Sequence, residues 1–172
     1  MKKVLETPKR HIILGKTALS KDKFLPIANH GGLLKPSGGL WASPYFSHGS
    51  FFSGWHKWCA REQKNWLTND SVILDIKDAT KFFVINSQKD LIQLFDIAGE
   101  VTNSIASLWK SLDFEKASTI FDVIYLTDEG QCKTRLPHNK PQYNLNSWDC
   151  ESILIMNFDC IEKWEYHKLD IV

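Results

Sequence analysis

The hydrophobic positions of this 172-residue chain fall into short runs that are separated by longer polar stretches. Short apolar runs with turn residues at their ends are typical of β-strands. The run SILIMN at 152–157 is apolar on both faces, which indicates a central strand of a sheet. The full set of runs predicts strands at 11–15, where a glycine ends the run, and at 40–43, 72–76, 81–85, 122–126, 152–157 and 163–167.

Three segments have the features of helices. Ser87 followed by Asp90 is a capping signal for a helix through Ala98, and Asp113 is expected to cap a shorter helix that leads directly into the strand at 122–126. Residues 54–67 carry aromatic residues at helical spacing. We interpret the stripe formed by Trp55, Trp58 and Trp66 as a core face of this helix rather than as a cofactor site.

Two long polar segments, 16–39 and 128–147, are predicted to be loops. Strict alternation of strands and helices is missing, so a doubly wound nucleotide-binding fold is not expected. The pattern predicts one α+β domain over 1–172, with 1–10 as a polar lead-in, six or seven strands and two or three helices.

The charge balance argues against a dedicated nucleic-acid-binding protein. Lys and Arg number 21 and Asp and Glu number 20, so the net charge is +1, although a local basic patch stays open. No signal-peptide core and no 18-residue apolar run occurs, so we expect a cytoplasmic protein that does not enter membranes.

The four cysteines lack the spacing of a metal site, and we expect no metal and free thiols. The glycine runs form neither a dinucleotide-binding G-x-G-x-x-G motif nor a P-loop. Lys21, Lys23 and Lys35 are interpreted as solvated loop charges, with contact to a pyrophosphate as the alternative.

Two carboxylates precede the predicted central strand. Asp149 and Glu151 are two residues apart, so in an extended chain both side chains lie on one side. They are either solvated charges or a site in which the strand fixes Glu151 at the edge of a cleft. A positioned carboxylate suits reactions that develop positive charge, such as cleavage of a glycosidic bond.

The segment WDCESILIMNFDCIEKWEY at 148–166 resembles the last motif of the ADP-ribosyltransferases, in which a glutamate opens a strand. GGLWASP at 38–44 is similar to the second motif of that family. That motif reads Gly-Leu-Tyr-Phe-Ala in the poly(ADP-ribose) polymerase branch and ends in a Ser-Thr-Ser-like run in the toxin branch. The resemblance covers 10–15, 40–66 and 121–165, in the order of the family's motifs.

The resemblance implies an ADP-ribosyltransferase-like fold, with a mixed, largely antiparallel split β-sheet, and a site for NAD as substrate. It places Glu151 beside the nicotinamide-side ribose, Asp149 where the acceptor is oriented, Trp41 on the nicotinamide ring and Ser43 on the dinucleotide. The family's first motif is His-Gly or Arg-Gly, and this chain has Leu14 and Gly15 there. The dinucleotide would then be held at Gly15 with Arg10 or His11 as the nearest candidates.

The expected function is transfer of ADP-ribose from NAD to a macromolecular acceptor, a protein or a nucleic acid, with release of nicotinamide. The small size suggests a toxin, an effector or a phage-conflict protein, for which a cognate antitoxin or immunity protein would be a partner. Two alternatives stay open. One is an NAD glycohydrolase on the same fold, with water as acceptor, and the other is a binding module that has lost the site.

Overall fold

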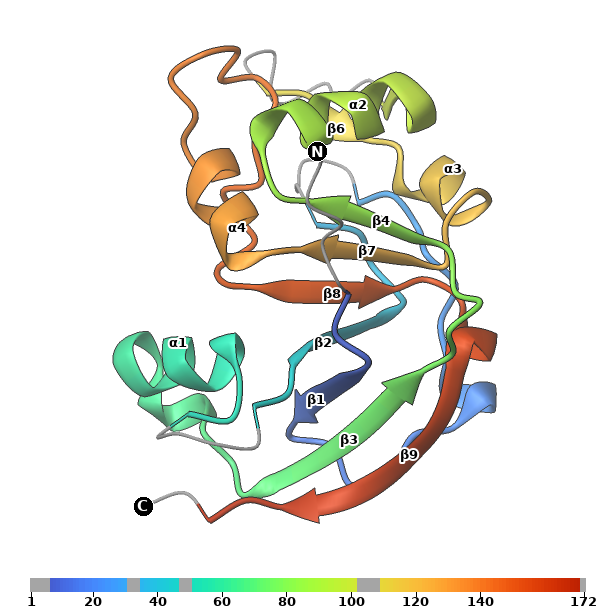
Figure 1. Ribbon diagram of the computed structural model, residues 1–172, viewed down its shortest axis with the longest axis vertical. Helices are drawn as coiled ribbons and strands as arrows, with labels where there is room; N and C mark the ends of the chain where they lie inside the picture. The colour runs from blue at the N-terminus through green and yellow to red at the C-terminus, as the bar shows by residue number, and fades with distance from the viewer. Residues whose placement is uncertain (1–6, 31–34, 47–50, 102–108, 171–172) are drawn as a thin grey trace.

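A seven-stranded sheet forms the centre of the structure, a computed structural model that describes residues 7–30, 35–46, 51–101 and 109–170 (Figure 1). The strands follow the order β4-β7-β8-β2-β1-β3-β9. β4 and β7 are parallel, and the other neighbouring pairs are antiparallel. The strands are β1 Arg10–Leu14, β2 Leu40–Pro44, β3 Asp70–Ile76, β4 Phe82–Ile85, β7 Val123–Leu126, β8 Ser152–Ile155 and β9 Ile161–Lys168.

The predicted α+β class with a mostly antiparallel sheet is therefore confirmed. β5 (Glu100–Val101) and β6 (Ser111–Leu112) add a small two-stranded ladder. Figure 1 shows β4, β7 and β8 running across the view and β1, β3 and β9 running obliquely below them, so the sheet twists strongly.

The described residues contain four α-helices, one more than the upper expectation. They are α1 Gly54–Glu62, α2 Gln88–Ala98, α3 Phe114–Ser118 and α4 Asp128–Thr134. The predicted caps are present: the side chain of Ser87 accepts a hydrogen bond from the backbone N–H of Asp90, and that of Asp113 accepts one from Lys116. Such caps satisfy backbone donors that have no partner inside the helix.

α4 lies inside 128–147, which the sequence predicts to be a loop, so that prediction is wrong for its first part. The Thr127 side chain caps the helix by accepting from the backbone N–H of Gly130. α4 has no apolar stripe, because the residues that it buries are Gly130, Gln131 and Thr134. A Cβ at Gly130 would lie 2.1 Å from the carbonyl oxygen of Ile85, so the helix packs directly on the backbone of β4.

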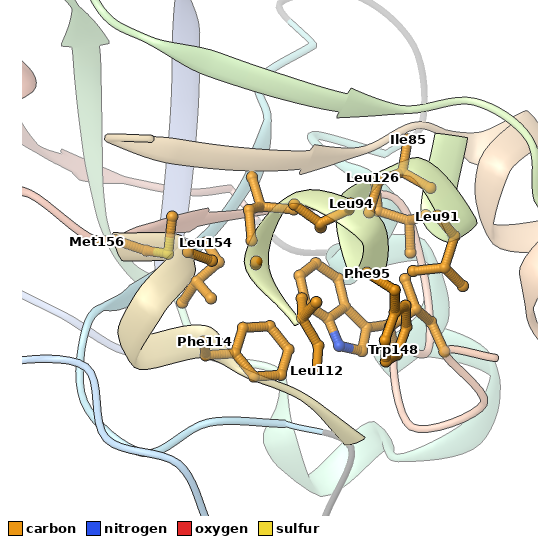
Figure 2. Packing of buried hydrophobic residues seen from close by; sticks show 14 of the residues in the cluster. Ile85, Leu91, Leu94, Phe95, Leu112, Phe114, Leu126, Trp148, Leu154 and Met156 are labelled. Atoms are coloured by element: carbon orange, nitrogen blue, oxygen red, sulfur yellow. The ribbon is translucent and has the colours of Figure 1, made fainter. Parts of the chain in front are cut away.

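β8 is buried on both faces, as SILIMN predicts. Leu154 belongs to a cluster under α2 and α3, whereas Ile153 and Ile155 belong to a cluster on the opposite face of the sheet. Figure 2 shows the first cluster, with the indole of Trp148 at its centre beside Phe114 and Leu94. Trp148 is 1% exposed, so it anchors the chain just before the two candidate carboxylates.

Two glycines allow the chain to enter β2. Gly38 and Gly39 have φ values of +76° and +63°, in the left-handed region that favours glycine. A Cβ at Gly38 would lie 2.0 Å from the carbonyl oxygen of Pro26, and one at Gly39 would lie 2.8 Å from that of Ile155. Glycine is thus required at both positions, because the chain at the start of β2 passes close to the backbone of Pro26 and Ile155.

The interpretation of the tryptophan stripe as a core face is wrong. α1 buries His56 and Cys59, while Trp55 and Trp58 are half-buried. Trp66, in a short 3₁₀ turn after α1, is 56% exposed. The three indoles pack on one another at the surface, with ring centroids 4.9–5.9 Å apart. We call these three residues the tryptophan cluster.

No helix in the described part of the chain is long and apolar enough to cross a membrane. Among the same residues, no group of three or more His, Cys, Asp or Glu side chains is arranged to hold a metal ion.

Candidate functional site

A cavity of about 330 Å³ lies beside β1 and β2, under the first turn of α1. Leu14 of β1, Trp41 and Ser43 of β2, and Trp55 of α1 contribute to its wall. Asp149, Cys150 and Ser152 close one side, and Lys35 closes another. The structure thus brings together segments from both ends of the chain, including three of the residues that the sequence predicts for the site: Trp41, Ser43 and Asp149.

Trp41 is held by the sheet and by an aromatic neighbour. It is opposite Leu154 in the antiparallel pair of β2 and β8. Its ring meets that of the buried Trp148 edge to face, with centroids 4.6 Å apart. Because Trp41 is half-buried, part of the indole stays open to the cavity. Trp41 and Ser43 both line the cavity, as the two-residue period of a strand predicts.

A lysine side chain occupies the cavity beside Trp41. The Nζ atom of Lys35 lies 3.1 Å from Oδ2 of Asp149 and 5.5 Å from the centroid of the Trp41 ring. Both side chains of this ion pair are about one-third exposed. An aromatic face and a carboxylate therefore converge on one positive charge, which marks the place where the cavity favours a cation.

The segment that contains Asp149 is held in place by α4 and by the core. Gln131, which is buried, donates from its side-chain amide toward the backbone carbonyls of Trp148 and Asp149, at 3.3 and 3.4 Å. Trp148 anchors the same segment in the core. The position of Asp149 is thus set by its neighbours in the chain, and its carboxylate is the part that reaches Lys35.

Glu151 points elsewhere. Its Oε1 atom accepts a hydrogen bond of 2.5 Å from the hydroxyl of Tyr125 on β7. Burial raises the pKa of the Glu151 carboxyl, and the nearby Asp128 carboxylate adds to this rise, while the bond from Tyr125 opposes it. Burial and the bond to Glu151 also raise the pKa of Tyr125.

The expected pairing of the two carboxylates on one side of the chain is not observed, because the segment is not extended. The chain bends at Cys150 and Glu151, and β8 begins only at Ser152. The Ser152 hydroxyl donates to the Cys150 carbonyl, and the Ser43 hydroxyl donates to the Glu151 carbonyl at 3.0 Å. Asp149 consequently turns into the cavity and Glu151 turns toward β7 and α4.

Arg10 lies in a different pocket, formed by β1, β3 and β9. Its guanidinium pairs with Asp75 at 3.2 Å and with Glu165 at 2.6 Å. The predicted role of Arg10 in holding a dinucleotide therefore has no support from its position. These two ion pairs instead connect β1 with β3 and β9.

His11 is fully buried in the sheet, and Gly15 lies in the exposed turn after β1. Burial lowers the pKa of His11 to about 4, an effect that the Lys9 backbone and the Asp75 carboxylate oppose. Neither ring nitrogen has a hydrogen-bond partner of normal geometry among the described residues. Leu14, between these two residues, is the one that lines the cavity.

A second cavity, of about 490 Å³, lies between α1 and α4. Asp149 and Cys150 line both cavities, so the two are neighbours. Figure 1 shows α4 above and α1 below the ends of β7 and β8, on the left of the view. Glu151 lies at this edge, because a Cβ on Gly54, the first residue of α1, would be 3.4 Å from the Cβ of Glu151.

Two residues of the site, Trp55 and Tyr125, are not predicted from the sequence, and Lys35 is predicted there only as the alternative to a solvated charge. Trp55 was assigned to a core face, Lys35 was interpreted first as a solvated loop charge, and Tyr125 was seen only as part of a buried strand. The only signal in the sequence is that Lys35 stands just before the glycines that open β2. Comparison with protein-family models, curated proteins and solved structures finds no match to this chain.

Proposed function

We propose that the first cavity binds the nicotinamide end of NAD and that the protein cleaves the nicotinamide–ribose bond and transfers ADP-ribose to an acceptor. The observation that carries this proposal is the position of the Lys35 ammonium, between the face of Trp41 and the carboxylate of Asp149. A site of this composition favours a flat cation, because the indole face attracts positive charge and stacks on a planar ring.

The nicotinamide ring of NAD is a flat cation with an attached carboxamide. Trp41 and Trp55 supply aromatic walls, and Ser43 and Ser152 supply small polar neighbours. A cation–π contact of a desolvated cation stabilises binding by about 2 kcal/mol. The cavity volume of about 330 Å³ is at the small end of ligand pockets, so it suits one end of the dinucleotide rather than the whole.

Binding would exchange one cation for another. The nicotinamide ring would take the place of the Lys35 ammonium beside Trp41 and Asp149. Lys35 would then be free to pair with the pyrophosphate, which carries negative charge next to the ring-bearing ribose. This exchange keeps Asp149 paired in both states, so the partly buried carboxylate is never left without an opposite charge.

The fold is consistent with the resemblance to ADP-ribosyltransferases in one respect. The three segments that resemble the motifs of that family include β1, β2 and β8, which are adjacent in the sheet, and the last segment also covers β7 and most of β9. We propose that this mostly antiparallel sheet is a divergent form of the ADP-ribosyltransferase fold.

The geometry supports the reverse of the roles that the resemblance implies for the two carboxylates. When the bond between ribose C1′ and nicotinamide breaks, its electron pair goes to the ring nitrogen, and positive charge develops on the ribose. Asp149 faces the cavity and would stabilise that charge. The acceptor nucleophile then bonds to C1′ and loses a proton. Glu151 lines neither cavity itself, but it follows Cys150, which lines both, and the raised pKa of its carboxyl suits it to take this proton.

The test is calorimetric titration of NAD, together with chromatographic measurement of nicotinamide release. Asp149→Asn keeps the shape of the side chain and should lower the rate of release by roughly two to three orders of magnitude, as for loss of one electrostatic group. Glu151→Gln should lower transfer to an acceptor in lysate more than release into water. Lys163→Gln, outside both cavities, serves as control. Failure of the native chain to bind NAD at millimolar concentration would overturn the proposal.

Two results would select the alternatives. Nicotinamide release without any modified macromolecule in lysate would identify an NAD glycohydrolase. Tight binding of NAD without release of nicotinamide would identify a binding module.

A further inference from the structure

We infer that the groove between α1 and α4, with the tryptophan cluster on its rim, binds single-stranded nucleic acid, with a base stacked on an indole and phosphates on the basic side chains of both helices. The inference rests on the aromatic surface, on the position of the charges along the groove, and on its contact with the first cavity.

The aromatic surface is continuous from one cavity to the other. Trp55 lines the first cavity, Trp58 lines the groove, and Trp66 is the most exposed of the three. The rings of Trp55 and Trp58 are nearly parallel, at 11°, and each lies 5.9 Å from the ring of Trp66. Bases of any sequence stack on such faces, since every base offers a π-surface.

The charges in the groove are partly segregated, with Glu62 as the exception at the outer end. Asp128 at the start of α4 and Asp149 lie at the end near β8, where α1 also begins. Arg61 of α1 and Arg135, which directly follows α4, each come seven residues after the first residue of the helix, about 10 Å along its axis. Lys57 lies between these ends on α1. The groove is therefore acidic at its inner end, and farther out it carries three basic side chains against one carboxylate, that of Glu62.

The basic side chains are available to a ligand. Lys57 and Arg135 are exposed and form no ion pair with another residue of the described ranges. The guanidinium of Arg61 meets Glu62 only at 3.6 Å, between two largely exposed side chains. Contacts of this kind are worth little in water, so phosphate oxygens can replace them.

A nucleotide complements both the basic end and the acidic end of the groove. Its phosphates are anionic, and the N–H groups of its base donate to carboxylates. The aromatic ring between them stacks on an indole. A peptide rich in Lys and Arg would satisfy the acidic end alone and would be repelled by Arg61 and Arg135. The net charge of +1 hides this local arrangement.

The bound strand would also be the acceptor of ADP-ribose, and this part of the inference rests on the proposed function. Asp149 and Cys150 line both cavities, and Glu151 lies beside Asp128 at the inner end of the groove. A nucleophilic nitrogen of the stacked base would then approach ribose C1′ from the groove and give up its proton to Glu151. The binding of the strand itself requires no NAD.

The experiment measures fluorescence anisotropy of labelled oligothymidylate and oligouridylate with the full chain, without NAD. If Lys57, Arg61 and Arg135 each neutralise one phosphate, log Kd should rise with log salt concentration with a slope of about 2. Trp66→Ala should weaken binding about tenfold, as for the loss of one stacked base. Arg135→Glu should also weaken binding and lower the slope.

The matched controls are Trp164→Ala, a 40% exposed tryptophan on β9, and Lys23→Glu, an exposed lysine far from the groove in sequence. Both should bind as the native chain does. Absence of salt-dependent binding, or equal losses in the controls and the groove variants, would overturn the inference. So would preference of the groove for a Lys- and Arg-rich peptide. If the strand binds and NAD does not, the proposed function fails and this inference stands.

Discussion

The hydroxyl of Tyr125 donates a 2.5 Å hydrogen bond to the Glu151 carboxylate, from β7 to the residue that precedes β8. Tyr125 is buried and Glu151 is half-buried, so water replaces this bond poorly. The bond fixes Glu151 on the side of the sheet opposite to Trp41, because Tyr125 is paired with Ile153, a member of the cluster on that side.

We expect Tyr125→Phe to lower the free energy of unfolding by about 1.5–3 kcal/mol at neutral pH, the usual range for a hydrogen bond to a charged group. The loss should shrink as the pH falls through the raised pKa of Glu151, since the protonated carboxyl needs the phenol less. Urea unfolding between pH 4 and 8 measures both effects.

The matched control is Tyr166→Phe. Its hydroxyl donates to Asp70 at 2.8 Å on an exposed surface, so we expect a much smaller loss than for Tyr125→Phe. When Glu151→Gln is also present, the loss of unfolding free energy caused by Tyr125→Phe should no longer depend on pH. Persistence of that pH dependence would assign it to another group.

Because His11 is buried, we expect the free energy of unfolding to fall in acid. Its pKa is about 4 in the folded chain and about 6.5 when unfolded, so the unfolded chain binds more protons between these values. The contribution of neutral His11 to stability is complete above pH 6.5 and is lost as the pH falls toward 4. The pKa difference corresponds to about 3 kcal/mol. His11→Leu should flatten the dependence of unfolding free energy on pH in this window.

The control for this prediction is His138→Gln, which replaces an exposed histidine and should leave the pH dependence unchanged. Acid unfolding that is equally steep in the native chain and in His11→Leu would show that carboxylates, rather than His11, dominate the loss.

The elements that the sequence predicted correctly are those with local signals. Apolar runs place β1, β2, β3, β4, β7, β8 and β9, and the side chains of Ser87 and Asp113 cap α2 and α3. α4 was missed because its buried residues are polar or small, and its cap at Thr127 follows directly on a strand. Periodicity detects apolar faces, and this helix has none.

Three of the predicted site residues, Trp41, Ser43 and Asp149, line the cavity, and strand alternation accounts for the first two. Trp41 and Ser43 share a face by the period of β2, and both reach the cavity. The partner of Asp149 could not be predicted, because Lys35 is 114 residues away in the chain. Arg10 and His11 were selected for their place near the first motif, whereas ion pairs and burial determine where their side chains lie.

Trp41 offers a test that separates packing from binding. Since the ring is half-buried, we expect Trp41→Ala to cost less than the 3–5 kcal/mol of a fully buried tryptophan. Trp41→Phe should keep most of the affinity for NAD because it keeps a π-face. Trp41→Leu should lose about a factor of ten. Thermal denaturation and calorimetric titration of the three variants measure both quantities, and equal affinity in the Phe and Leu variants would remove stacking from the site.

The last prediction concerns the exchange of cations at Lys35. Lys35→Met keeps a long apolar side chain but removes the ammonium that lies beside Trp41 and Asp149. Asp149 then lacks its partner, so the cavity should bind nicotinamide methylated at its ring nitrogen, a flat cation without phosphate, several-fold more tightly than the native cavity does. The same variant should bind ADP-ribose more weakly, because the pyrophosphate loses its lysine. Lys21→Met, which removes a lysine from an exposed ion pair with Asp159, should change neither affinity.

Calorimetric titration measures the affinity for each of the two ligands. Lys35→Met changes the two affinities in opposite directions only if Lys35 occupies the place of the nicotinamide ring. A fall in affinity for both ligands would make Lys35 a fixed part of the wall, and the cavity would then have to bind NAD without displacing it.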